Sequence, residues 1–151
     1  MAKDLSKASI KFVDDNKVRT EILNKYDEYG KEKINIWAMN IITDVLKYVK
    51  FDEDILQVIK EGINVNNQWR HGLAKMHDVR KVGFKIHALA REKNDLIEKT
   101  ALRAIGQAIS SGHMKEHAMI ASDYYIKLIG MISNNDINLI SIERKSQLNR
   151  L

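Results

Sequence analysis

Residues 103–128 read RAIGQAISSGHMKEHAMIASDYYIKL, and this stretch determines the fold class. Apolar residues recur in it at spacings of three and four on both sides of a Ser-Ser-Gly-His break at residues 110–113. That period places apolar side chains on one face of a helix, and a glycine favours a helix end. The stretch therefore predicts a helical hairpin, in which one helix ends near Gly112 and the next covers residues 115–133.

The same periodicity continues along the chain. It predicts further helices over residues 18–29, 34–49, 53–69, 73–93 and 95–112, and a polar segment after residue 136 that folds back or frays. Proline is absent and strand-like alternation is confined to residues 10–12, so a sheet has almost no support. Short connections favour antiparallel neighbours. We predict one all-α domain over residues 1–151, with six or seven antiparallel-packed helices as a bundle or stacked hairpins.

Local residue types indicate where these helices begin and how they pack. Acidic residues precede three of them and are typical N-caps: Asp52, Asp95 and Asp136. The predicted inward-facing residues include both tryptophans and two isoleucines, namely Trp37, Trp69, Ile63 and Ile97. Small residues at Gly83, Ala104 and Ala108 let neighbouring helices approach closely.

Composition excludes several classes of protein. The chain has no cysteine, which removes disulfides, thiol nucleophiles and cysteine-bound metals. No apolar run approaches the ~20 residues that a membrane-spanning helix needs, and no apolar leader follows the first residues. We therefore expect a cytoplasmic protein without membrane contact.

Positive charge is concentrated in one part of the chain. The formal net charge is +5, and residues 69–103 alone hold nine Lys or Arg against four Asp or Glu. Four of the seven arginines lie there, namely Arg70, Arg80, Arg91 and Arg103. No groove-reading motif and no interleaved aromatic residues accompany this block, so nucleic acid is not the partner we expect.

Two histidines have a spacing that occurs in metal-binding sites. Residues 113–117 read HMKEH, which on a continuous helix would place His113 and His117 one turn apart beside a carboxylate, as in some zinc peptidases. Gly112 instead puts His113 at or before the helix start, and no third ligand is evident. We predict no metal and no cofactor here. The alternative is structural: His113 caps the helix, and His117 hydrogen-bonds Asp123 or Tyr124.

A second polar stripe lies on the predicted helix over residues 73–93. Arg80, Phe84, His87 and Arg91 follow one another at spacings of four, three and four, away from the apolar row. Such a stripe lines a recognition face or forms salt bridges to neighbouring helices, and the sequence leaves both open. Ser110 and Ser111 have no evident histidine and acid partner, so no catalytic residue is predicted.

Several short motifs in order resemble a known family. They are Trp37-Ala38, Trp69-x-x-Gly72, His87-Ala88-x-Ala90-Arg91-Glu92, Arg103-Ala104-x-Gly106, Gly112-His113, His117-Ala118 and Ala121-x-Asp123-Tyr124. Together they resemble immunity proteins encoded beside bacterial polymorphic toxins, the fifth-numbered immunity group and its relatives. The resemblance covers residues 34–130, and residues 1–33 and 131–151 lie outside it.

The resemblance implies an all-helical intracellular protein that neutralises a cognate toxin by binding it, without catalysis of its own. Its polar signature falls on Arg103, His113, His117 and Asp123, and Gln107 stands where the family has histidine. The alternative is a small metal- or ligand-binding protein, with or without enzymatic activity, that uses the His113, His117 and Asp123 region. The sequence identifies no particular toxin and no oligomeric state.

The positive charge adds an expectation about the toxin. Arg80, His87 and Arg91 are the candidate partner-recognition face. Since opposite charges steer association, a partner bound there presents an acidic or apolar surface, or else the basic block lies away from the interface.

Overall fold

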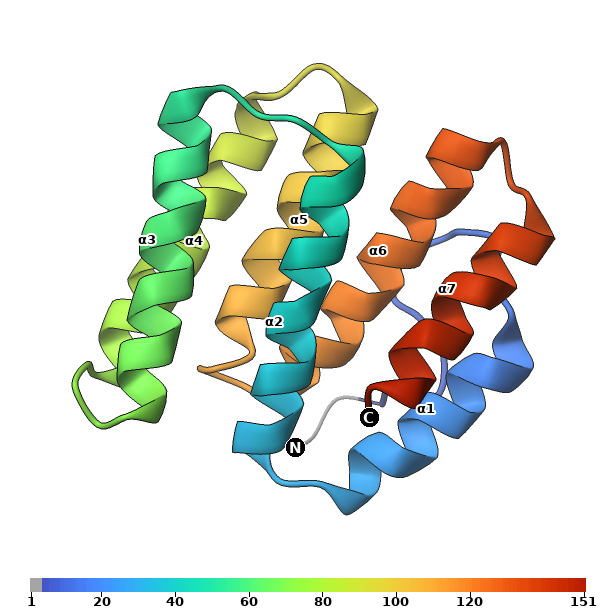
Figure 1. The fold of residues 1–151 in the computed structure, drawn as a ribbon, viewed down its shortest axis with the longest axis horizontal. Coiled ribbons are helices and arrows are strands. Elements are labelled where there is room, and N and C mark those ends of the chain that lie inside the picture. The colour runs from blue at the N-terminus through green and yellow to red at the C-terminus, as the bar shows by residue number, and fades with distance from the viewer. Residues whose placement is uncertain (1–3) are drawn as a thin grey trace.

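Seven helices make up the part of the chain that the computed structural model describes, residues 4–151 (Figure 1). They are α1 (Asn16–Glu28), α2 (Lys31–Tyr48), α3 (Glu53–Arg70), α4 (Met76–Glu92), α5 (Leu96–Ser110), α6 (Glu116–Ser133) and α7 (Ile137–Asn149). No strand occurs among the described residues, and residues 10–12 are irregular. The prediction of a single all-α domain with six or seven helices is confirmed.

Helix ends lie where the capping residues predict them. The side chains of Asp52, Asp95 and Asp136 accept hydrogen bonds from backbone N–H groups of the first turns of α3, α5 and α7. Each such cap satisfies an otherwise unpaired donor and contributes about 1 kcal/mol. Gly72 closes the α3–α4 connection with a φ of +76°, a conformation that favours glycine.

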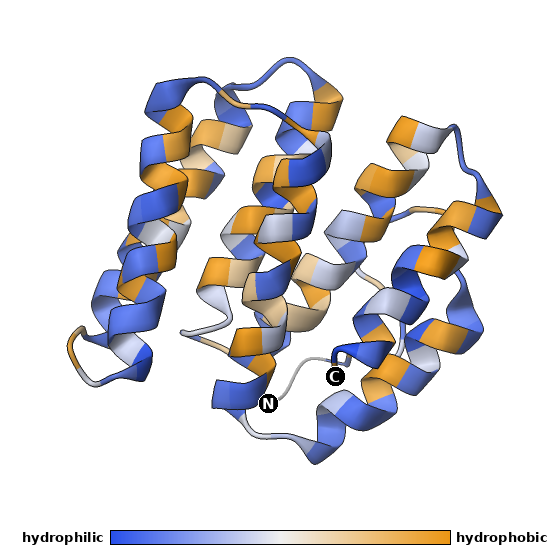
Figure 2. Cartoon of the chain, viewed as in Figure 1, coloured by the Kyte–Doolittle hydropathy of each residue, from blue (hydrophilic) through white to orange (hydrophobic). Residues whose placement is uncertain are grey.

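Helix α5 is the centre of the fold. It packs against α2, α3, α4 and α6, while α7 packs against α6 and α1 (Figure 1). The α4–α5 approach is close, because a Cβ placed on Gly83 would lie 2.5 Å from Oγ of Ser110. The predicted role of Gly83 is therefore confirmed. Along each helix, hydrophobic and hydrophilic positions alternate, as expected for helices that bury one face (Figure 2).

The packing order departs from a simple series of hairpins. Consecutive helices pair from α3 to α7, but α2 packs chiefly on α5 and α6, and α1 packs on α7. Two predicted inward positions were wrong: Ile63 and Ile97 are 38% and 36% exposed. The buried face of α3 follows Ile59, Gly62 and Asn66, so Ile63 lies just beyond its edge.

Helix α7 belongs to the core, so of the two alternatives for this segment, folding back and fraying, the structure shows folding back. Arg144 and Gln147 are fully buried although the helix is polar in sequence. The indole nitrogen of Trp37 donates to the backbone oxygen of Gln147 at 2.9 Å, which ties α2 to α7. Trp37 is thus a core anchor as predicted, whereas Trp69 is only partly buried. None of the helices within residues 4–151 combines the length and hydropathy of a membrane span.

Candidate functional site

Six of the seven predicted site residues gather on one surface of α4, α5 and the start of α6. The charged groups that act on His87 and His113 show this. Arg103, His117 and Arg91 lower the pKa of His87, and Arg80 lowers the pKa of His113. We call this set the basic surface: Arg80, His87, Arg91, Arg103, His113 and His117. The predicted recognition stripe and most of the family-like signature therefore lie together.

His87 fits into a gap that a glycine leaves on α5. A Cβ placed on Gly106 would lie 2.8 Å from Cε1 of the His87 ring, so the ring rests directly on the α5 backbone. Nη1 of Arg103 lies 3.4 Å from Nδ1 of His87. Because a guanidinium only donates, Nδ1 accepts and the ring is neutral. Burial, followed by the charges of Arg103, His117 and Arg91, lowers the pKa of His87 to about 4.

His113 and His117 stack across the start of α6. Their ring centroids are 6.1 Å apart with an interplanar angle of 26°. His113 precedes α6, which begins at Glu116, so the two do not form a helical i, i+4 pair. Burial, and then the charges of Arg80 and Lys31, lower the pKa of His113.

His117 has a partner on α5 that the sequence did not predict. Its Nδ1 lies 2.6 Å from Oε1 of Gln107, and since a carbonyl oxygen accepts, Nδ1 donates. The expected contact with Asp123 is wrong, because arginines hold that carboxylate elsewhere. Gln107, which departs from the family pattern, thus supplies an acceptor that joins α5 to α6. Among residues 4–151 no three His, Asp or Glu side chains are placed to hold a metal ion.

The three arginines of the basic surface form no ion pair with a carboxylate of residues 4–151. None of the ion pairs found within residues 4–151 includes Arg80, Arg91 or Arg103. The guanidinium of Arg80 instead lies 5.0 Å from the ring centre of Phe84, which is 57% exposed. Of the two interpretations of this stripe, salt bridges to neighbouring helices are thus not what the structure shows.

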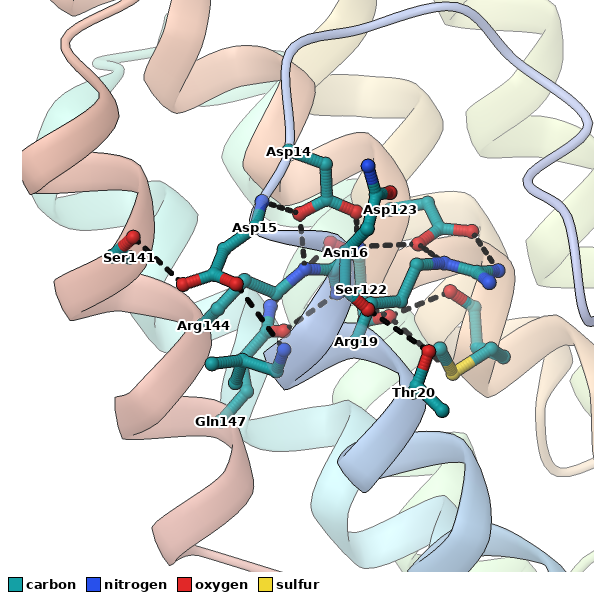
Figure 3. A network of polar contacts seen from close by, with 12 residues as sticks. Asp14, Asp15, Asn16, Arg19, Thr20, Ser122, Asp123, Ser141, Arg144 and Gln147 are labelled. Carbon is teal, nitrogen blue, oxygen red and sulfur yellow. Dashed lines mark hydrogen bonds and ion pairs between the residues drawn. The ribbon is translucent and has the colours of Figure 1, made fainter.

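Asp123 lies apart from the other signature residues, in a buried network between α1, α6 and α7 (Figure 3). Both of its carboxylate oxygens accept from Arg19, at 2.9 Å each. Oδ1 also accepts from Nη2 of Arg144 at 2.6 Å, and Arg144 forms two further bonds of 2.8 and 2.9 Å with Asp14. Asp123 is 3% exposed, so its contacts tie helices together.

Within this network the charges are balanced, and each buried polar group has a hydrogen-bond partner. Two guanidinium groups face two carboxylates, and the remaining donor of Arg144 reaches Ser122 and Gln147. Burial by itself lowers the pKa of Arg144, but contacts with Asp14 and Asp123 outweigh it and raise that pKa. Within residues 4–151 no buried side-chain nitrogen or oxygen lacks a partner. Such pairing offsets the cost of burying charge.

A second buried network joins α2, α3 and the end of α5. Arg70 donates at 2.7 Å to the amide oxygens of Asn35 and Asn66, and these amides in turn donate to Ser111 and to the backbone of Ile109. Arg70, although part of the basic stretch, therefore serves the fold. The sequence carried a signal for both networks: Asn66 follows Ile59 and Gly62 at helical spacing, and Arg144 follows Ile137 and Ile140 in the same way.

The fold and the site define a small all-α protein with a cluster of arginine and histidine side chains on one surface and a closed ionic network inside. The chain belongs to the family described as Imm-5 like putative immunity protein, whose model matches residues 24–151. The match extends beyond residues 34–130 and includes α7 with Arg144. Neither the comparison with curated proteins nor that with solved structures gives a match.

Proposed function

We propose that this protein is an immunity protein that binds a cognate toxin in the cytoplasm and neutralises it by protein–protein contact, without catalysis of its own. The observation that carries the proposal is the family match over residues 24–151, which spans six complete helices and the end of α1. A rigid helical scaffold suits this role, since it presents a fixed surface without an ordering cost on binding.

The basic surface is the proposed contact region. Arg103, His113 and His117 of the family-like signature lie there with Arg80, His87 and Arg91. Arginine beside exposed aromatic rings is enriched where proteins bind one another. Asp123 is assigned a positioning role, because its carboxylate is buried between Arg19 and Arg144.

The metal- or ligand-binding alternative loses its main support. It needs Asp123 beside His113 and His117, but the carboxylate is held in the network of α1, α6 and α7 (Figure 3). The partner of His117 on α5 is Gln107, whose side-chain amide is a weak metal ligand.

Co-expression with the product of the adjacent gene tests the proposal. We expect the full chain to restore growth of cells that produce that protein, and the two to co-purify as a stable complex. An inactive variant of the adjacent gene product serves as the control for toxicity. Growth arrest that persists despite equal expression of both chains, with no complex on size-exclusion chromatography, would contradict the proposal.

A further inference from the structure

The seven arginines fall into three groups according to what faces them. Three are paired with carboxylates: Arg19 with Asp123, Arg144 with Asp14 and Asp123, and Arg150 with Asp44. Arg70 donates to side-chain amides. The remaining three, Arg80, Arg91 and Arg103, have no carboxylate within ion-pair distance in the part of the chain that the structure describes, and all three lie on the basic surface.

The surroundings of the two half-buried histidines show the same excess of positive charge. Every charged group that acts on His87 or His113 is a cation or another histidine: Arg103, His117 and Arg91 for the first, Arg80 and Lys31 for the second. Among the described residues, no carboxylate is one of the groups that act on these two rings. Cations therefore surround both rings, from Lys31 at the start of α2 to Arg91 at the end of α4.

Apolar groups accompany this charge. Phe84 is 57% exposed beneath the guanidinium of Arg80, and Met114, between the two stacked histidines in sequence, is 43% exposed. Interface hot spots combine buried aromatic contacts with arginine, whose planar fork matches a carboxylate. A phosphate backbone requires a row of cations but gains little from an exposed phenyl ring and a thioether. The combination of arginines with exposed apolar side chains therefore favours a protein partner over a nucleic acid.

We infer that the basic surface docks an acidic face of the partner protein, whose carboxylates pair with Arg80, Arg91 and Arg103 while an apolar group covers Phe84. This inference rests on the proposed function and adds to it the charge of the toxin surface that is bound. His87 acts as a positioning residue: its neutral ring, fixed on Gly106, accepts from Arg103 and keeps that guanidinium on the surface.

The test uses charge reversal at matched net charge. The variant Arg80→Glu with Arg91→Glu changes the net charge by the same amount as the control Lys60→Glu with Lys81→Glu, whose lysines are exposed on α3 and α4. The probe is the catalytically inactive product of the adjacent gene, measured by surface plasmon resonance. We expect the arginine variant to weaken binding at least ~100-fold, chiefly through slower association, and the control to change it by less than ~3-fold.

Two further measurements separate charge from shape. Raising NaCl from about 50 to about 500 mM slows association of the wild type, because screening shortens the reach of the charges. Arg80→Lys with Arg91→Lys retains the association rate but dissociates faster, since a lysine cannot form the bidentate contact. Circular dichroism and the melting temperature confirm that the arginine variants fold.

The outcomes distinguish this inference from the proposed function. A complex whose affinity is the same in the arginine variant and the lysine control overturns the inference and leaves the proposed function standing. Failure of the wild type to bind or to protect overturns both. Binding of a DNA or RNA oligonucleotide by the free protein at about 150 mM NaCl, abolished in the arginine variant, assigns the surface to nucleic acid and also overturns the inference.

Discussion

The buried network of α1, α6 and α7 and the basic surface of α4, α5 and α6 use arginine in opposite ways. In the network, Arg19 and Arg144 each meet carboxylates at 2.6–2.9 Å and are 5% and 0% exposed. On the basic surface, Arg80, Arg91 and Arg103 meet no carboxylate of the described residues. Between these two regions, the presence of a counter-charge therefore separates arginines that hold the fold from arginines available to a partner.

The family-like signature is divided between the two regions. Asp123 belongs to the network, whereas Arg103, His113 and His117 belong to the surface. Removing one member of a buried ion pair leaves an uncompensated charge in the core, which is costly to stability. Removing an exposed cation that has no partner costs the fold almost nothing. Substitutions in the two regions should therefore affect different measurements.

The largest effect on stability is expected for Asp123→Asn. The asparagine keeps the shape of the side chain but leaves Arg19 and Arg144 with one carboxylate, that of Asp14, between them. We expect a loss of ~3–5 kcal/mol in the free energy of unfolding, measured by urea denaturation. Asp27→Asn, on the exposed side of α1, is the matched control. A loss below ~1 kcal/mol would show that the network is not what holds α1 and α7 in place.

A smaller effect is expected for Gly106→Ala, at the border of the basic surface. The new Cβ would lie 2.8–3.0 Å from the His87 ring, which must move away from α5. We expect destabilisation of ~1–3 kcal/mol and displacement of His87 from Arg103.

The double-mutant cycle provides the control. In a His87→Ala background the ring is absent, and alanine is preferred to glycine inside a helix by about 1 kcal/mol. Gly106→Ala should then be neutral or stabilising, and this change of sign identifies the ring as the cause. Equal destabilisation in both backgrounds would refute the contact between Gly106 and His87.

The pH dependence of stability should report on His87. Its pKa is about 4 in the folded protein and ~6.5 in the unfolded chain, so the unfolded state binds the proton first as pH falls. Stability should decline from about pH 6.5 to about pH 4 by ~1–2 kcal/mol through this group, after discounting for the partial exposure of the ring.

A glutamine at this position does not titrate, so His87→Gln should remove the part of the stability loss that comes from His87. The difference between the wild type and this variant cancels the carboxylates that titrate over the same range. His77→Gln, the same change at an exposed position of α4, is the matched control. Parallel pH profiles for wild type and His87→Gln would contradict a depressed pKa at His87.

What the sequence predicts reliably is local. The spacing of apolar residues, the N-cap aspartates and the glycines at helix ends predicted the helices and the α5–α6 hairpin. Each of these signals depends only on residues a few positions apart. The network escaped prediction because Arg144 and Asp14 are 130 positions apart, and nothing in a single sequence pairs them. The same holds for His87 and Gly106, which meet only because α4 crosses α5 there.

Charged residues on apolar stripes were the missed signal. Arg144 continues the stripe of Ile137 and Ile140, and a helix that buries this face must also bury the guanidinium. A buried guanidinium requires carboxylates, and in the structure Asp14 and Asp123 supply them. By contrast, Arg80 and Arg91 lie off the apolar stripe of α4, and for them the sequence left a recognition face and salt bridges to neighbouring helices both open.

The smallest effect on stability is expected for Arg91→Gln. This substitution removes one cation from a group that repels itself and has no carboxylate of residues 4–151 to lose. The free energy of unfolding should therefore change by less than ~0.5 kcal/mol, with any change toward greater stability.

Salt dependence and the titration of His87 test whether repulsion among the cations explains the stability of Arg91→Gln. In about 1 M NaCl the stability difference between the wild type and Arg91→Gln should vanish, because charges at the surface are screened. The pKa of His87, followed by NMR, should rise in the variant, since one of the cations that depress it is gone. A marked loss of stability in Arg91→Gln would mean that this arginine has a counter-charge after all, and the division between paired and unpaired arginines would fail at that position.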